Sequence, residues 1–323
     1  MGGARTEFFS LFTVPKEAGQ CTKYLYLFVN IILTPLLLIG RSIYIFILPC
    51  FGSFFKSMFL KCVQACGCVK MCWKPFIDQE FPPNRKSLGN DDPAKWARLS
   101  QMNVKHRSGR MAPADCLFND SINPKDVAQG AMGDCWLMAA IATLCERPAL
   151  ISNCFITRTF NPFGKYKIRL FDTAKNKFVI LTIDDYVPVN PTTLKPLYSH
   201  LTSNEIWPLL LEKAYAKLKG SYQSLSGGLP LDAMRTLTGY SGEHLILSGD
   251  KKSKEAMFKK LQYYFNSGCL IAAGSKGQDK TRTEGRDKVQ GSIVGGHAYS
   301  VLAIKSPMLT TAPVHLLKLR NPW

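Results

Sequence analysis

Runs of apolar residues divide the chain into segments that predict distinct elements. Residues 136–144 form an apolar run of strong helix formers without Gly or Pro, which predicts a buried helix that begins near Cys135. Alternating residues at 166–171 and 177–183 predict a β-hairpin. Helical periodicity at 205–218, before a glycine at position 220, predicts a further helix.

The second half of the chain shows a different pattern. Helices are expected at 231–237 and 253–265, strands at 269–273, 297–304 and 314–320, and loops earlier in the chain at 90–93 and 105–114. Because helices dominate the first half and strands the second, the sequence predicts an α+β protein of two lobes. The flexible joint at 226–228 is the expected boundary between them.

Cys135 stands where a nucleophile is expected. Asp134 before it suits a helix N-terminus and can accept hydrogen bonds from the first free N–H groups. A thiol at this end of a helix feels the positive end of the dipole, which favours the reactive thiolate. Gln129, six residues upstream, offers an amide N–H to a developing oxyanion beside the backbone N–H of Cys135.

A nucleophilic cysteine requires a base and a residue that orients the base. His297 opens a predicted strand, and Asn321 follows the neighbouring strand, so the amide of Asn321 can accept the imidazole N–H and hold the tautomer. Taken singly, Cys135 is equally a core residue, His297 a strand histidine and Asn321 a turn residue before proline. The ordered set of Gln, Cys, His and Asn favours the catalytic interpretation. Four other cysteines are expected to be small core residues: Cys116, Cys145, Cys154 and Cys269.

With these residues in place, the chain resembles the calpains, a family of papain-like cysteine proteases. The matching segments are 129–144, 296–301, 320–323, 204–207, 211–217, 220–222, 225–228, 76–83 and 87–89. The resemblance implies a papain-like two-lobed core with subdomains at 76–228 and 229–323, and an intracellular endopeptidase acting on protein or peptide substrates. It also implies that Trp323 shields the contact between His297 and Asn321 from water.

The resemblance further implies a calcium site in the first subdomain. Asp126 and Glu205 match its carboxylate positions, and carbonyls near Asn119 and Ser121 would complete it. Calcium takes six to eight oxygen ligands, so carboxylates, carbonyls and waters together suit it. Ser121 replaces a glycine of the family. No organic cofactor is expected.

The chain stops at Trp323, whereas calpains continue past the matching motif with further strands and calcium ligands. This difference leaves an alternative to the calcium-dependent endopeptidase. The alternative is a catalytically inactive calpain-like adaptor at a membrane, or a fragment of a longer calpain.

Residues 1–75 differ from the rest in composition. Residues 24–40 and 42–55 are free of charge, and lysines stand on both sides of this apolar stretch. Positive charge at both ends favours a re-entrant hairpin or in-plane helices, with a single tilted span as the second possibility. The sequence therefore predicts a membrane-associated segment, with the protease core facing the cytoplasm.

Two lipidation signals accompany this segment. Gly2, with a threonine at position 6, fits the N-myristoylation pattern. The palmitoylation candidates are four cysteines that follow the apolar stretch: Cys62, Cys66, Cys68 and Cys72. A zinc cluster is the competing interpretation of these cysteines, and their spacing lacks the usual paired knuckles.

The composition of the chain limits the kinds of binding partner that it is expected to have. The 323-residue chain carries a formal net charge of +18, but its lysines are scattered and no aromatic-interleaved basic ribbon accompanies them. We therefore expect membrane lipids and protein substrates as partners, and no nucleic acid. The eleven cysteines follow no regular framework, which points to a reducing compartment.

Overall fold

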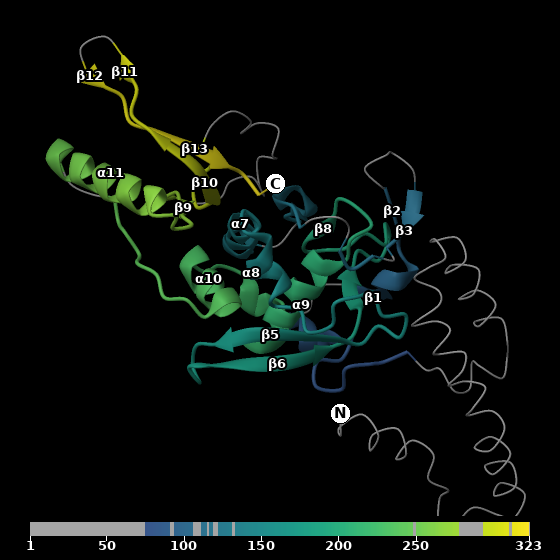
Figure 1. Ribbon diagram of the computed structural model, residues 1–323. Coiled ribbons are helices and arrows are strands. Elements are labelled where there is room, and N and C mark those ends of the chain that lie inside the picture. Colours follow the sequence, from purple (N-terminus) through teal and green to yellow (C-terminus); the bar gives the residue numbers. More distant parts are fainter. Residues whose placement is uncertain are drawn as a thin grey trace, which may run out of the picture. The chain divides into compact units, whose positions relative to one another are not determined.

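The computed structural model describes residues 75–90, 94–105, 111–114, 116–118, 122–130, 133–247, 250–277, 293–309 and 312–322. The chain divides into two compact units, Met1–Lys74 and Pro75–Trp323, and every described residue belongs to the second (Figure 1). The predicted membrane segment and its lipidation candidates lie outside the described residues. Within the described part of the chain, no helix is long and apolar enough to cross a membrane.

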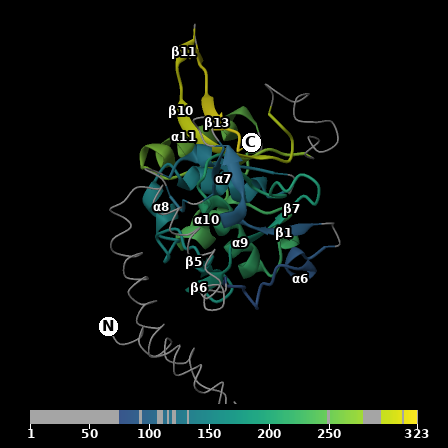
Figure 2. The ribbon, with the colours of Figure 1, turned by 90° about the vertical axis from the view of Figure 1, so that its right-hand side faces the viewer.

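Helix α7 (Cys135–Leu144) forms the centre of the main core, and all ten of its residues are buried. In two perpendicular views it lies between helix α10 (Pro230–Thr238) and strand β10 (Ala298–Lys305), and it also contacts strand β9 (Ala272–Gly274) (Figures 1 and 2). The predicted buried helix is confirmed at these bounds. A helix that is apolar all round requires such enclosure, because every face must leave water.

Two further helices complete the packing around α7. Helix α9 (Trp207–Lys219) begins with a proline in its first turn and ends at Gly220, whose φ of 98° lies in the left-handed region that glycine adopts readily. Helix α8 (Pro148–Ser152) follows α7 directly. Helix α10 comes after the predicted boundary at residue 228, yet its Ala233 and Leu237 belong to the same core as α7.

The predicted hairpin is present as β5 (Tyr166–Asp172) and β6 (Lys177–Ile183), paired antiparallel from Tyr166↔Ile183 to Asp172↔Lys177. Alternate residues of β5 are buried, as expected for a strand with one face on the core.

A three-stranded antiparallel sheet in the order β13–β10–β9 forms late in the chain, with β13 at Leu316–Arg320. Helix α11 (Lys251–Asn266) packs on β10, and a small second core of Phe258, Val301 and Ile304 joins them. The predicted helix and strands of this half are all present, although β9 begins three residues later than expected.

Short elements connect these parts: α6 (Arg85–Leu88), β1 (Lys95–Arg98), η5 (Leu99–Gln101), β2 (Asn103–Lys105), β3 (Met111–Pro113), η6 (Pro124–Asp126), β4 (Val127–Ala128), β7 (Tyr186–Val189), β8 (His200–Leu201), η7 (Gln223–Leu225), β11 (Met308–Leu309) and β12 (Ala312–Pro313). The loop predicted at 105–114 is wrong in part, because β2 and β3 pair across it. Backbone pairing in a short polar hairpin needs no alternation of apolar residues, so the pattern did not reveal it.

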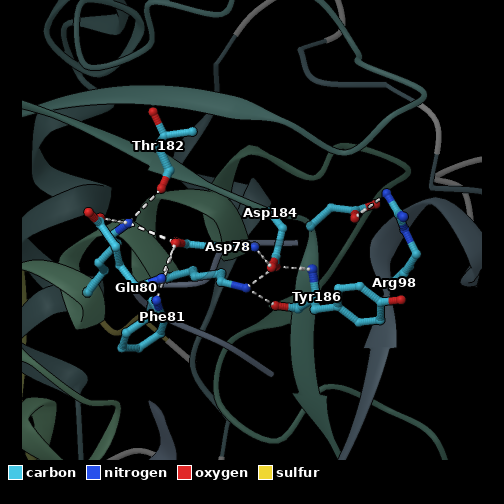
Figure 3. Close-up of polar contacts among 10 residues, drawn as sticks. Asp78, Glu80, Phe81, Arg98, Thr182, Asp184 and Tyr186 are labelled. Atoms are coloured by element: carbon cyan, nitrogen blue, oxygen red, sulfur yellow. Dashed lines mark hydrogen bonds and ion pairs between the residues drawn. The ribbon is translucent and has the colours of Figure 1, made fainter. Parts of the chain in front are cut away.

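A buried polar network ties the start of the described chain to the core (Figure 3). The backbone N–H of Asp78 donates to Asp184 Oδ2 at 2.8 Å. Lys217 of α9 donates to both carboxylate oxygens of Asp78, at 3.0 and 2.9 Å, and to the carbonyl of Thr182 at 2.8 Å. The segment around Asp78 is therefore held against β6 and α9 by charge-assisted hydrogen bonds.

The network continues through a second lysine of α9. The Lys213 ammonium donates to Asp184 and to the carbonyl of Tyr186, and the side chains of Lys213 and Asp184 are both fully buried. Burial lowers the pKa of Lys213, and Asp184 opposes that effect. Arg98 pairs with Asp185 at 2.7 Å beside them (Figure 3). Removing one member of such a buried pair leaves the other charge uncompensated.

Candidate active site

Cys135 is the first residue of α7, and its side chain is 9% exposed. Its neighbour Trp136 donates its indole N–H to the carbonyl of Leu225 at 2.9 Å and packs edge-on against Tyr215 of α9, with ring centroids 5.7 Å apart. A Cβ added at Gly228 would lie 2.5 Å from the Trp136 ring, so only glycine fits beneath the indole. The turn that carries the thiol is thus fixed by the chain that follows α9.

Gln129 is 4% exposed and precedes a glycine that makes a close backbone contact. A Cβ added at Gly130 would lie 1.4 Å from the carbonyl oxygen of Tyr198, so the chain can pass there only as glycine. The Tyr198 ring stacks in turn on Tyr222, with centroids 4.8 Å apart. The Gln129 segment therefore has little freedom to shift.

His297 and Asn321 lie in hydrogen-bonding contact. His297 precedes β10 and Asn321 follows β13, and these strands pair with Ser300 opposite Arg320. His297 Nε2 lies 2.9 Å from Asn321 Oδ1, and the His297 side chain is 2% exposed. Because an amide oxygen only accepts, Nε2 carries the proton in this contact, and Nδ1 is then the basic ring nitrogen.

The histidine is also fixed by its backbone. The His297 N–H donates to Ser275 Oγ at 3.1 Å, and the Ser275 N–H donates to the carbonyl of His297 at 2.9 Å. The His297 ring meets Tyr299 edge-on, with centroids 5.0 Å apart. Ser275, Asn321 and the Tyr299 ring thus determine where the imidazole lies.

Several contacts join this histidine sheet to the cysteine helix. The Gln129 N–H donates to the carbonyl of Pro322 at 3.1 Å. The hydroxyls of Thr143 and Ser300 lie 2.9 Å apart, and the Ser300 hydroxyl lies 3.3 Å from the carbonyl of Ala139. These contacts join the segment of Gln129 to that of Asn321, and helix α7 to strand β10. Trp323 lies outside the described residues.

The prediction that Asp134 caps α7 is wrong in one respect. Asp134 occupies the N-cap position, but its side chain makes no capping hydrogen bond. Its charge acts instead on the buried Glu212 of α9. Burial, followed by the charge of Asp134, raises the pKa of Glu212 well above its ordinary value.

Asp126 and Glu205, the predicted calcium ligands, are each 1% exposed. Burial raises the pKa of the Cys145 thiol, and the charges of Asp126 and Glu205 raise it further, so both carboxylates lie near the same thiol. The carbonyl candidates Asn119 and Ser121 are outside the described residues. Among the residues described, no group of three or more His, Cys, Asp or Glu side chains could hold a metal. Two buried carboxylates suit calcium as part of an oxygen shell completed by carbonyls and waters.

The other cysteines differ in exposure. Cys145 and Cys154 are buried, as predicted for core residues, and burial raises the pKa of Cys154 to about 12. Cys116 is half-buried. The expectation that Cys269 lies in the core is wrong, because its side chain is exposed just after the C-terminus of α11.

Comparison with known proteins places these features in a family. A profile described as calpain family cysteine protease matches residues 76–323. The chain is 36% identical over 263 residues to the calpain-type cysteine protease DEK1 of Arabidopsis thaliana, which covers 77% of this chain and 12% of DEK1. It is 33% identical over 251 residues to calpain-8 of Rattus norvegicus, covering 77% of this chain and 35% of calpain-8.

The chain therefore belongs to the calpain family of cysteine proteases. Calpain-9 of Homo sapiens is a further relative, 30% identical over 279 residues that cover 84% of this chain and 37% of calpain-9. The chain spans only about an eighth of the length of the DEK1 relative it matches.

The sequence interpretation assigned no role to the acid pair of Asp134 and Glu212 or to the pair of Lys213 and Asp184. A signal for them was present. Glu212 and Lys213 interrupt the apolar start of α9, and both side chains are buried, at 3% and 0% exposed. A charge within an apolar helix face indicates a buried polar partner, but spacing along the chain does not say which one.

Proposed function

We propose that this chain is a calcium-dependent, cysteine-type endopeptidase that carries out limited intracellular proteolysis at a membrane. The observation that carries the proposal is the 2.9 Å contact between His297 Nε2 and Asn321 Oδ1. The Gln129 N–H donates to the carbonyl of Pro322, next to Asn321, and the Ser300 hydroxyl of β10 contacts Thr143 of the cysteine helix. Membership of the calpain family supports the same reaction.

The reaction begins when His297 Nδ1 takes the proton from the Cys135 thiol. The sulfur attacks a substrate peptide carbonyl, a C–S bond forms, and the carbonyl oxygen becomes an oxyanion. Asn321 holds the imidazole in the tautomer that presents Nδ1 and stabilises the imidazolium once it forms. The low exposure of His297 favours this charge-assisted hydrogen bond.

Gln129 and the backbone N–H of Cys135 are the proposed donors to the oxyanion. Donors that are already fixed need no reorganisation when charge develops, and removing one such donor costs roughly 100- to 1,000-fold in kcat. The close contact of Gly130 and the hydrogen bond from the Gln129 N–H to the Pro322 carbonyl hold the backbone that carries the Gln129 side chain.

The acyl-enzyme then forms and breaks down. The protonated imidazole gives its proton to the leaving amine as the C–N bond breaks, which leaves a thioester on Cys135. Water attacks this thioester and gives a proton to His297. The tetrahedral intermediate formed by this attack then breaks its C–S bond, which releases the carboxyl product, and His297 returns the proton to the thiol.

Calcium, when bound, would be held by Asp126 and Glu205 with neighbouring carbonyls. It would neutralise two buried carboxylates and tether the chain before β4 to the chain before α9. The proposed membrane tether rests on the charge-free stretches of residues 24–40 and 42–55 and on their flanking lysines.

Casein cleavage by the full chain tests the proposal. We expect cleavage in calcium that is abolished by Cys135→Ala and retained by Cys269→Ala, which removes an exposed thiol instead. Cleavage that survives Cys135→Ala would refute the nucleophile. Equal cleavage in calcium and in chelator would refute only the calcium requirement. Failure of the parent chain to cleave casein under any condition would refute the proposed peptidase activity.

A further inference from the structure

The hydroxyls of Thr143 and Ser300 meet where helix α7 packs against strand β10 (Figures 1 and 2). Their oxygen atoms lie 2.9 Å apart, and both residues are 1% exposed. Each hydroxyl also contacts the carbonyl oxygen of Ala139, Thr143 at 2.7 Å and Ser300 at 3.3 Å. The three oxygens therefore form a closed triangle inside the core. Because water does not reach this position, each hydroxyl depends on the other two oxygens for its hydrogen bonds.

Ser300 lies at the point of the sheet where the strands of the proposed base and its orienting residue pair. It stands opposite Arg320 of β13 on one side and Ala272 of β9 on the other. His297 precedes Ser300 by three residues, and Asn321 follows Arg320 directly. Because the paired strands are hydrogen-bonded to each other, a movement of Ser300 relative to α7 carries His297 and Asn321 together.

On the helix side, the triangle belongs to the same element that presents the thiol. Ala139 and Thr143 follow Cys135 by about one and two turns of α7, which is ~6 and ~12 Å along the helix axis. Since α7 is buried on every face, close packing leaves it little freedom to deform between these residues. The triangle thus connects the helix of the proposed nucleophile to the sheet of the proposed base.

A second contact joins the end of α7 to strand β13 at the surface. Arg320 Nη1 donates to Glu146 Oε1 at 2.6 Å, and the two side chains are 31% and 41% exposed. Salt screens such an exposed pair, and the cost of ordering two long side chains offsets much of its attraction. The buried hydroxyls of Thr143 and Ser300 face neither loss, so they define the distance between α7 and β10 more sharply than the ion pair does.

We propose that the hydroxyl contact between Thr143 and Ser300 determines how β10 docks on α7. This docking places the His297 imidazole within reach of the Cys135 thiol for the reaction. Thr143 and Ser300 are positioning residues, because they act through the two elements that carry the reacting groups. The role in catalysis rests on the proposed function of Cys135 and His297, whereas the docking contact itself does not.

Ser300→Ala separates positioning from stability. The variant removes the hydroxyl on the sheet side and leaves Thr143 bonded to the Ala139 carbonyl, so no buried donor loses its partner. We therefore expect the urea midpoint of the full chain to stay close to the parent value. For a peptide substrate, kcat is expected to fall by at least about threefold, and by up to about 100-fold if the reacting atoms separate by about 1 Å. KM is expected to stay within about twofold, because the pair touches no substrate.

Variants of Thr143 test the same contact from the helix side. Thr143→Val removes the hydroxyl and keeps the branched shape, so kcat is expected to fall as in Ser300→Ala, whereas Thr143→Ser keeps the hydroxyl and should retain kcat within about twofold. The double variant should fall no further than the larger single loss, since both changes remove one interaction. Thr238→Val is the matched control with unchanged kcat, because Thr238 donates to the Met234 carbonyl at 2.7 Å in the same way, within α10.

Alkylation by iodoacetamide, mapped to Cys135 by mass spectrometry across pH, tests the docking without turnover. An imidazole beside a thiol favours the reactive thiolate, so Cys135 of the parent protein should react at lower pH than Cys135 of Ser300→Ala or Thr143→Val.

Four results would overturn the positioning role. They are a kcat in Ser300→Ala within about threefold of the parent value, a fall in kcat explained by the unfolded fraction, an unchanged alkylation profile in both variants, and an equal loss in Thr238→Val. A parent protein that cleaves nothing, although its variants show the shifted alkylation profile, would instead count against the proposed peptidase and leave the docking role standing.

Discussion

Replacing Asn321 with alanine removes the hydrogen bond to His297 Nε2 without touching the thiol. The bond measures 2.9 Å, and it joins a half-buried amide to an imidazole that is 2% exposed. A hydrogen bond to a charged group is worth about 1.5–3 kcal/mol. If the bond acts fully on the imidazolium formed in the transition state, Asn321→Ala lowers kcat/KM by roughly 10- to 150-fold.

The assay is steady-state cleavage of a peptide substrate by the full chain, with kcat and KM measured separately. We expect the loss in kcat, because the imidazolium is stabilised during reaction and not when substrate binds. Asn266→Ala is the control, since Asn266 is an exposed asparagine at the end of α11. A fall in kcat/KM of less than about twofold is smaller than one hydrogen bond is worth, and it would refute the role of Asn321. A rise in KM with an unchanged kcat would refute it as well.

Three further substitutions test the structure around the site. Gly228→Ala places a Cβ 2.5 Å from the Trp136 ring, so overpacking should lower the free energy of unfolding in urea by about 1–3 kcal/mol. It should lower cleavage as well. An unchanged urea midpoint would contradict the close contact. Lys213→Met leaves the buried Asp184 carboxylate without its lysine partner and should lower the free energy of unfolding by about 3–5 kcal/mol. A decrease of less than about 1 kcal/mol would contradict the buried pair. Glu212 has a pKa raised above its ordinary value of 4.5, so the folded chain keeps a proton that the unfolded chain loses. The free energy of unfolding should therefore fall as pH rises above 4.5 toward the raised pKa. Urea midpoints measured across pH should show this fall in the parent protein and not in Glu212→Gln.

Much of the fold follows from local pattern. The apolar run after Cys135 cannot face water on any side, so a buried helix was the expected outcome, and α7 has the predicted bounds. The hairpin of β5 and β6 and the ends of α9 and α10 at glycines follow from alternation and capping chemistry. These features depend on residues close together along the chain.

Contacts between distant residues were harder to predict. Asp134 was expected to cap α7, but its side chain makes no capping hydrogen bond, and its charge raises the pKa of the buried Glu212, 78 positions away along the sequence. The spacing of apolar residues predicts which face of a helix or strand is buried, but it does not predict which residue packs against that face. Cys269 was expected in the core for the same reason: its neighbours are apolar, but it follows α11 at an exposed position.

Covalent labelling of the full chain with a thiol-reactive peptide epoxide, mapped by mass spectrometry, tests the proposed nucleophile most directly. The account predicts one dominant adduct, on Cys135, that forms in calcium, is suppressed by chelator and disappears in Cys135→Ser. An adduct mainly on another of the eleven cysteines, or no adduct at any calcium concentration, would contradict it.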